Sequence, residues 1–259
     1  LSGELWLADP ARARWVSFTA PAETATTSIV QGSVSEDGRV EGSLRLQLTG
    51  YAARAARQRI AAEAADGGGE TDGAGAAAEE AADAPEALAL GVVSVEGVHE
   101  VDGPLTMEAT FSSAAGEAVD DEIYLPPFLV MQLDENPFER PTRSFPVDFA
   151  YPFERTYVAS ITLPEGYEAA EIPAPVRIAT PGRAVSYSRV VGAEMGRLLV
   201  RAVLTVSEAR VPPAEYPALR RLYDEIVAAE AEAVVLTRTV PPPSPADPPP
   251  PAPPAGDAQ

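Results

Sequence analysis

The chain contains no cysteine, no lysine and a single histidine among its 259 residues. Without a thiol, cysteine nucleophiles, disulfide frameworks and Cys-rich zinc or iron–sulfur sites are excluded from this chain. Without lysine, the usual phosphate-binding loop, in which a Gly-rich turn leads into Lys, is excluded as well. The one histidine, His99, leaves room for at most one imidazole that acts as a general base or metal ligand. We therefore expect no cofactor and no metal ion.

Basic residues are also scarce. The chain carries 39 acidic and 19 basic side chains, which gives a formal net charge of −20. An acidic chain repels nucleic-acid phosphates and anionic lipids, so we expect no nucleic-acid partner. No stretch approaches the roughly 20 apolar residues of a membrane span, and we expect no membrane insertion. The hydrophobic fraction of 46% is nevertheless sufficient for a folded core.

Most of the chain has the alternating pattern of antiparallel strands. Asp37 and Gly38 lie between two alternating runs, which is a strong hairpin signal because both turn residues tolerate positive φ. The fold class that we predict is mainly β, with antiparallel sheets of the β-sandwich type. Beyond the strand-like residues 5–7, 15–18 and the hairpin, strands are expected at residues 91–101, 105–111, 122–125, 128–133, 155–163, 176–179, 184–191 and 197–206.

Two segments have helical rather than strand periodicity. Residues 51–64 are rich in Ala and Arg and predict a short helix. Residues 214–230 predict a second helix, with Pro217 tolerated in its first turn because a missing N–H costs little there. The apolar face of this second helix is formed by residues at three- and four-residue spacing, namely Leu219, Leu222, Tyr223, Ile226 and Val227.

These patterns divide the chain into four parts. Residues 1–64 form a β-hairpin region with a short helix, and residues 65–87 form an acidic, Ala- and Gly-rich flexible insertion with at most a frayed helical turn. Residues 88–238 form a β-sandwich-like domain with the second helix, and residues 239–259 form a disordered Pro-rich tail. Whether the strands before and after the insertion share one sheet stays open, because periodicity does not determine strand pairing.

An aromatic segment at residues 138–157 is the first candidate site. Exposed aromatic rings stack on glycans and peptides, so this segment is a candidate binding surface. The alternative, which we favour, is that the rings fix an irregular connection against the sheet, since core aromatics outnumber ligand platforms. The candidate residues are Phe138, Phe145, Phe149, Tyr151 and Phe153.

An acidic cluster is the second candidate. Asp120, Asp121 and Glu122 could serve a carboxylate-based hydrolase or bind calcium, but the spacing of a calcium loop is absent. A solvated loop explains such a charge run better. His99 lies in an alternating strand, where parity places it on an exposed face without a second metal ligand.

Several stretches of the chain together carry a resemblance to a known family. They are Arg14-Trp15-Val16-Ser17-Phe18, Glu36-Asp37-Gly38-Arg39-Val40-Glu41-Gly42, Leu48-Thr49-Gly50-Tyr51-Ala52, Asp134-Glu135-Asn136-Pro137-Phe138, Arg143-Ser144-Phe145-Pro146-Val147-Asp148-Phe149-Ala150-Tyr151-Pro152, Ile161-Thr162-Leu163-Pro164-Glu165-Gly166-Tyr167, and residues 212–227. With these stretches the chain resembles the C-terminal, β-rich region of bacterial transglutaminase-like proteins. The resemblance covers roughly residues 1–238, outside the insertion, and its middle and final stretches are the most specific in combination.

In that family, an N-terminal β-sandwich precedes a papain-like core with a Cys, His and Asp triad, and a β-rich region follows. Nothing here matches the Cys or the His, and Asp9 is only faintly similar to the strand that carries the Asp. The resemblance therefore implies a non-catalytic C-terminal scaffold or accessory region, not an enzyme by itself. Its partner would be the catalytic core of the same parent chain, in the cell envelope, the periplasm or outside the cell.

The first residue, Leu1, follows no initiator Met or signal peptide, and we expect the chain to be a fragment. Two other functions remain as alternatives. One is a stand-alone exported β-sandwich module that binds a glycan or peptide, and the other is the carboxylate-based hydrolase.

Overall fold

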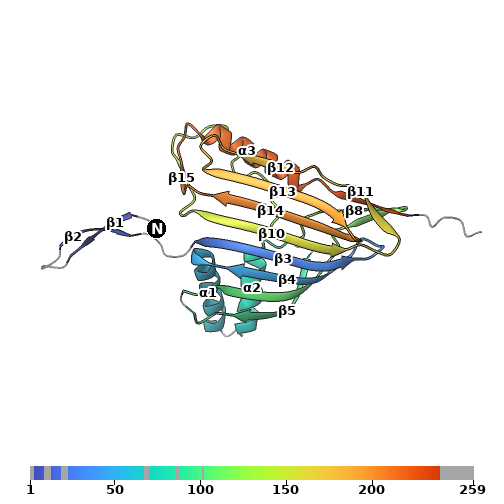
Figure 1. The fold of residues 1–259 in the computed structure, drawn as a ribbon. Coiled ribbons are helices and arrows are strands. Elements are labelled where there is room, and N and C mark those ends of the chain that lie inside the picture. The colour runs from blue at the N-terminus through green and yellow to red at the C-terminus, as the bar shows by residue number, and fades with distance from the viewer. Residues whose placement is uncertain are drawn as a thin grey trace, which may run out of the picture.

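The fold is built on one large, twisted sheet (Figure 1). The computed structural model describes residues 3–8, 13–18, 23–66, 70–85, 88–100 and 102–239. Eight strands form the sheet, in the order β12 (Val176–Ala179), β13 (Val185–Glu194), β14 (Arg197–Val206), β10 (Phe153–Thr162), β3 (Thr24–Val34), β4 (Val40–Leu48), β6 (Leu105–Ser113) and β5 (Leu88–Glu96).

Neighbouring strands of this sheet are antiparallel, except that β10 and β3 run parallel. A mainly β, antiparallel-dominated fold is thus confirmed. Because β3 and β4 pair with strands that follow the insertion, the two parts of the chain share one sheet. Smaller sheets combine β11 (Tyr167–Glu171), β16 (Val234–Arg238), β8 (Glu122–Leu125) and β7 (Glu117–Val119); β15 (Arg210–Val211) and β9 (Val147–Asp148); and β1 (Gly3–Leu7) and β2 (Arg14–Phe18).

The predicted hairpin of β3 and β4 forms, with Val34 paired to Val40, but positive φ is found at Gly38 and not at Asp37. Gly38 has a φ of +83°, and its N–H donates to the carbonyl of Ser35 at 2.9 Å. The carboxylate of Asp37 accepts hydrogen bonds from the Ser35 hydroxyl and the Arg39 N–H. These bonds, led by the one from Ser35, lower the pKa of Asp37. Positive φ favours Gly at this position because no Cβ is present to clash.

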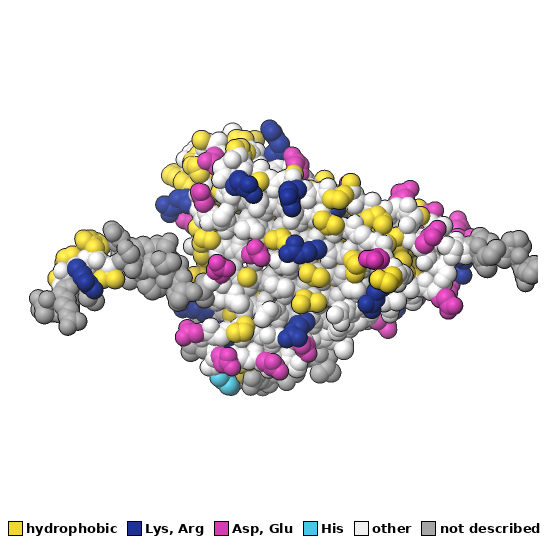
Figure 2. Space-filling view, in the orientation of Figure 1, with side chains coloured by type: hydrophobic (Ala, Val, Ile, Leu, Met, Phe, Trp, Pro, Cys, Tyr) yellow, Lys and Arg dark blue, Asp and Glu magenta, His cyan; other side chains and the backbone are white. Residues whose placement is uncertain are grey.

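Helices cover one face of the large sheet, and the other face is open (Figures 1 and 2). The helices α1 (Gly50–Ala65) and α3 (Tyr216–Glu230) confirm the two helices expected from periodicity. Alternate residues of each central strand point toward the helices and are buried, among them Leu44, Leu46, Tyr157, Val200 and Leu198. Such alternation is expected for a sheet with one buried face.

The expectation of a flexible insertion is wrong for the described part of residues 65–87. This part contains a third helix, α2 (Glu70–Ala82), which packs against α1. Small side chains allow this packing: Ala74, Ala77, Ala78 and Ala82 are buried, and a Cβ added to Gly73 would lie 2.9 Å from the Cα of Ile60. The Ala- and Gly-rich composition therefore provides a close helix–helix contact rather than a loop.

The strand expected at residues 128–133 is also wrong. Four consecutive side chains, Phe128 to Met131, are buried, and this does not fit the alternation of a strand with one exposed face. The backbone turns at Met131, where φ is +61°, and the Met131 N–H donates to the carbonyl of Ala82 at 2.6 Å. The segment follows β8 as an irregular stretch of chain, and the bond from Met131 ties it to the end of α2.

Other features were not expected or lie outside the described part. The strands β11 and β16, which pair with each other, were not predicted. Asp9 and residues 240–259 of the Pro-rich segment lie outside the described residues. Within the described residues, none of the helices has the length and apolar character needed to cross a bilayer.

Candidate functional site

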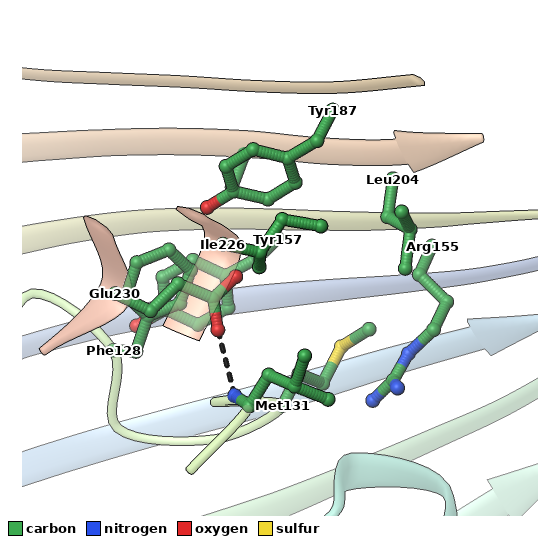
Figure 3. Close-up of a pocket in the computed structure, with 10 residues that line it drawn as sticks. Phe128, Met131, Arg155, Tyr157, Tyr187, Leu204, Ile226 and Glu230 are labelled. Atoms are coloured by element: carbon green, nitrogen blue, oxygen red, sulfur yellow. Dashed lines mark hydrogen bonds between the residues drawn. The ribbon is translucent and has the colours of Figure 1, made fainter. Parts of the chain in front are cut away.

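A small pocket lies between the helix-covered face of the sheet, α3 and the irregular segment after β8 (Figure 3). Its volume of about 30 Å³ is room for one or two water molecules. Carbon atoms dominate its walls, and the polar groups are one carboxylate, one guanidinium and two phenols. The lining residues are Phe128, Met131, Leu133, Arg155, Tyr157, Tyr187, Ala202, Leu204, Ile226 and Glu230.

Glu230 is the buried carboxylate of this pocket. It is the last residue of α3, and only 4% of its surface is exposed. Its Oε2 accepts a hydrogen bond from the backbone N–H of Leu133 at 2.6 Å. Burial disfavours the charged form and raises the pKa of Glu230 to about 6, although the bond from Leu133 acts in the opposite direction. The carboxylate thus fastens the irregular segment to the end of α3.

Two phenols lie beside Glu230. Burial raises the pKa of both Tyr157 and Tyr187. The Tyr157 hydroxyl donates to the carbonyl of Pro127 and accepts from the N–H of Leu129, both at 3.2 Å. The Tyr187 hydroxyl has no hydrogen-bond partner within the described part, yet it is close enough to Glu230 to lower the pKa of that carboxyl. Tyr187 is therefore the one phenol here that could still bind a water molecule.

Two arginines connect the pocket to its surroundings. Arg155 forms an ion pair of 3.2 Å with Asp83, at the end of α2. Arg189 is completely buried on β13, and its guanidinium donates to the carbonyl of Ala229 in the last turn of α3 and to Glu232 at 2.8 Å. A third bond goes to a carbonyl before β12 at 2.7 Å. A cation at a helix C-terminus satisfies free carbonyls and complements the helix dipole.

The chemistry available in the pocket is limited. A volume of about 30 Å³ does not admit a peptide or a sugar. The carboxylate, one phenol and the Arg155 guanidinium already bind groups of the protein itself. The arrangement therefore fits an internal anchor between α3, the sheet and the irregular segment.

Sequence reasoning missed these residues, although a signal was present. Glu230 follows Ile226 by four residues and so continues the apolar stripe of α3. Arg189 lies at an inward position of β13, between Tyr187 and Val191, which are both buried. A charged residue whose spacing places it among buried apolar residues is expected to be buried too, with partners that bind its charged group.

The aromatic segment is mostly used in packing. Phe138 is buried, while Phe149 and Phe153 are partly buried against the core. Tyr151 stacks on Tyr51, with ring centroids 4.6 Å apart. The ring of Phe138 meets Tyr216 and Tyr223 of α3 edge to face. It meets Phe149 in the same way, and Phe149 in turn meets Phe153.

Phe145 differs from the other four candidates because 80% of it is exposed. The structure thus does not bring the five rings together on one open surface. A role in ligand binding stays a prediction, and Phe145 and the partly exposed Tyr151 are the rings accessible for it.

The acidic cluster lies at the turn between β7 and β8. Asp120 has a φ of +55°, Asp121 lies 3.5 Å from Arg238, and Glu122 accepts a 2.7 Å hydrogen bond from the Tyr124 hydroxyl. His99 is exposed, in a turn after β5 rather than in the strand expected there. Among the described residues, no three His, Asp or Glu side chains are grouped as metal ligands.

Residues of two of the stretches quoted in the sequence analysis, 134–138 and 212–227, anchor α3. The Asn136 amide donates to the Arg220 carbonyl at 2.9 Å and to Asp224 at 2.7 Å. In return, the Arg220 guanidinium donates to the Phe138 carbonyl at 3.0 Å. The Tyr216 hydroxyl donates to the Arg140 carbonyl at 2.6 Å. These two motifs, 80 residues apart in sequence, thus form one contact surface in the fold.

The region that contains these contacts has relatives. Residues 121–236 match DUF3858. This family is described as a domain of unknown function with a solved structure, and the match runs from β8 to β16. It therefore includes the pocket, α3 and the motifs that α3 contacts. No curated protein matches the chain.

One solved structure is weakly similar, a crystal structure described as a "putative protease" from Parabacteroides distasonis. The identity is 16%, and the match covers 38% of this chain and 19% of that one, with a TM-score of 0.33. The matched part is thus about a fifth of that protein. A likeness at this level assigns neither fold nor function.

Proposed function

We propose that this chain is the non-catalytic, C-terminal scaffold region of an exported transglutaminase-like protein, and that it supports a papain-like catalytic core of the same parent chain. The observation that carries the proposal is how the polar groups of the pocket are used. Glu230 and Arg155 bind the protein's own groups, as does Arg189 outside the pocket lining, and the pocket has no room for a substrate.

The contacts of the motifs support the same reading. Asn136, Phe138, Tyr216 and Arg220 all serve the packing of one segment on α3. Residues used in this way stabilise a fold without performing chemistry. The match to DUF3858, a domain of unknown function, assigns no activity to the matched region, and the activity of a parent protein is left to experiment.

The proposal is tested first in the gene and then at the bench. The reading frame upstream of Leu1 should continue and should encode a Cys followed by a His-aromatic motif. A frame without these residues would overturn the proposal. The purified chain should also show no hydrolysis or transamidation of casein and peptide amides, whereas the parent protein should show one of them. Activity of the chain alone, lost on replacement of Asp120, Asp121 and Glu122 by amides, would favour the carboxylate-based hydrolase.

Phe145 favours one other function, a stand-alone module that binds a glycan or peptide, because a ring that is 80% exposed is accessible for stacking on such a ligand. Saturable binding to a polysaccharide or peptide panel that Phe145→Ala and Tyr151→Ala abolish would support it. A panel without binding would leave the scaffold as the better account.

A further inference from the structure

The hairpin of β1 and β2 presents exposed aromatic rings. Trp6 lies directly opposite Trp15, with ring centroids 5.4 Å apart in an edge-to-face arrangement. The two rings are 53% and 63% exposed, and Val16, on the opposite side of the strand from Trp15, is 36% exposed. The hairpin stands apart from the large sheet (Figure 1).

Exposed indole rings on an isolated hairpin favour a state in which the hairpin is docked on another surface. A two-stranded hairpin alone is marginally stable in water, and it gains stability when an apolar face is covered. Two exposed indoles that lie side by side also exceed what scattered surface residues explain. The hairpin thus needs a surface that accepts aromatic rings.

The open face of the large sheet has a matching surface. Register places Val190, Arg201, Val158 and Ile29 next to one another across β13, β14, β10 and β3. These four residues, together with Leu199 on β14, form what we call the aliphatic row. Val190 is 55% and Leu199 is 42% exposed, and hydrophobic atoms surround the basic groups on this face (Figure 2).

Arg201 gives this row a preference for aromatic partners. The neighbouring Arg45 forms an ion pair of 3.3 Å with Glu108, but Arg201 has no ion pair or ring contact within the described part. A guanidinium without an anionic partner attracts the face of an indole ring, and the aliphatic neighbours exclude water from that contact. The two unfilled surfaces of the chain are therefore complementary in chemistry.

We propose that the Trp hairpin of one copy docks on the aliphatic row of a second copy, so that two chains form a dimer by exchanging their hairpins. The hairpin of each copy would contact the aliphatic row of the other copy, so the same contact would occur twice, as a two-fold axis requires. The proposal goes beyond the scaffold function and does not depend on it. A scaffold without a catalytic core could dimerise in this way, and a monomeric one could still be a scaffold.

The sequence provides its own reporter, because Trp6 and Trp15 are the only two tryptophans. Analytical ultracentrifugation and tryptophan fluorescence of the full chain should follow the same concentration series. We expect a monomer–dimer equilibrium in which the emission moves to shorter wavelength as dimer forms. Trp15→Ala, in the hairpin, and Val190→Asp, in the aliphatic row, should each weaken dimerisation at least tenfold. Phe145→Ala, which removes an exposed ring elsewhere, should leave it unchanged.

Three results would overturn the proposal. The first is a monomer with water-exposed emission at every concentration. The second is a monomer with short-wavelength emission, which would place the hairpin on its own chain. The third is a dimer that Val190→Asp leaves intact while its circular dichroism and Tm match those of the parent chain, because the hairpin would then dock elsewhere.

Discussion

Replacing Glu230 by Gln should stabilise the protein at neutral pH. The carboxyl is buried at the C-terminal end of α3, where both desolvation and the helix dipole oppose a negative charge. Gln keeps an oxygen that can accept the hydrogen bond from the Leu133 N–H. It can also donate an N–H toward the Tyr187 hydroxyl, which lacks a partner within the described part.

The pKa of Glu230 sets the magnitude and the pH range. Folding raises this pKa from 4.5 to about 6. At about 1.4 kcal/mol per pKa unit, the ionised carboxylate lowers the free energy of unfolding by about 2 kcal/mol at pH 7.5. A raised carboxyl pKa gives a stabilisation that is fully present below the unfolded value and is lost as the pH rises through the folded value. Glu230→Gln should therefore gain about 2 kcal/mol at pH 7.5, and this gain should vanish near pH 4.5.

Urea unfolding between pH 4.5 and pH 8 measures this difference directly. The matched control is Glu225→Gln on the same helix, because Glu225 is exposed and forms no ion pair among the described residues. The control should follow the parent protein at every pH. A parallel pH dependence of Glu230→Gln and the parent protein would refute the reasoning, because Glu230 would then not change its pKa on folding.

Other predictions concern packing and are measured by urea or thermal unfolding. Arg189→Met should keep the buried volume but lose the bonds to the end of α3, at a cost of about 2–3 kcal/mol, whereas Arg177→Met on the exposed side of β12 should be nearly neutral. Phe138→Ala should cost about 3–5 kcal/mol, whereas Phe145→Ala, at an exposed ring, should cost under about 0.5 kcal/mol. Gly42→Ala should cost about 1–3 kcal/mol because its Cβ would collide with the backbone of β3, and an unchanged midpoint would contradict that contact.

Local patterns predicted the sheet well because strand alternation and turn chemistry act over a few residues. Asp37 and Gly38 define the β3–β4 hairpin by themselves, since the Asp37 carboxylate and the positive φ of Gly38 are local features. The strands at residues 155–163, 176–179, 184–191 and 197–206 were found for the same reason, whereas β11, at Tyr167–Glu171, was not. Pairing between distant strands, such as the parallel contact of β10 with β3, depends on the whole chain and left no local signal.

The helix α2 shows where composition misleads. Acidic, Ala- and Gly-rich segments usually stay solvated because they have little apolar area to bury. Here Gly73 and Ala77 lie against α1, where a larger side chain would separate the two helices. The stabilisation comes from the partner helix α1, which Gly73 meets at Ile60 and Glu63. A window-based reading of residues 65–87 does not include that partner.

The candidate site was predictable only in its residue types. Aromatic rings in the segment 138–157 suggested either binding or packing, and Phe138, Phe149 and Phe153 pack. The buried charges Glu230 and Arg189 were not singled out from the sequence. Their phase with the neighbouring buried positions is visible in the sequence. Periodicity should therefore be read for the charges that interrupt an apolar stripe as well as for the stripe itself.

The residues that carry the sequence resemblance can be described by their contacts in the structure. Asn136 and Phe138 bind α3 through a side-chain amide, a carbonyl and an aromatic ring. Arg220 and Tyr216 supply the complementary groups from α3. A chain that keeps these four residues keeps the anchor of α3. The contacts of these residues therefore explain the packing of α3 and assign no activity to the region.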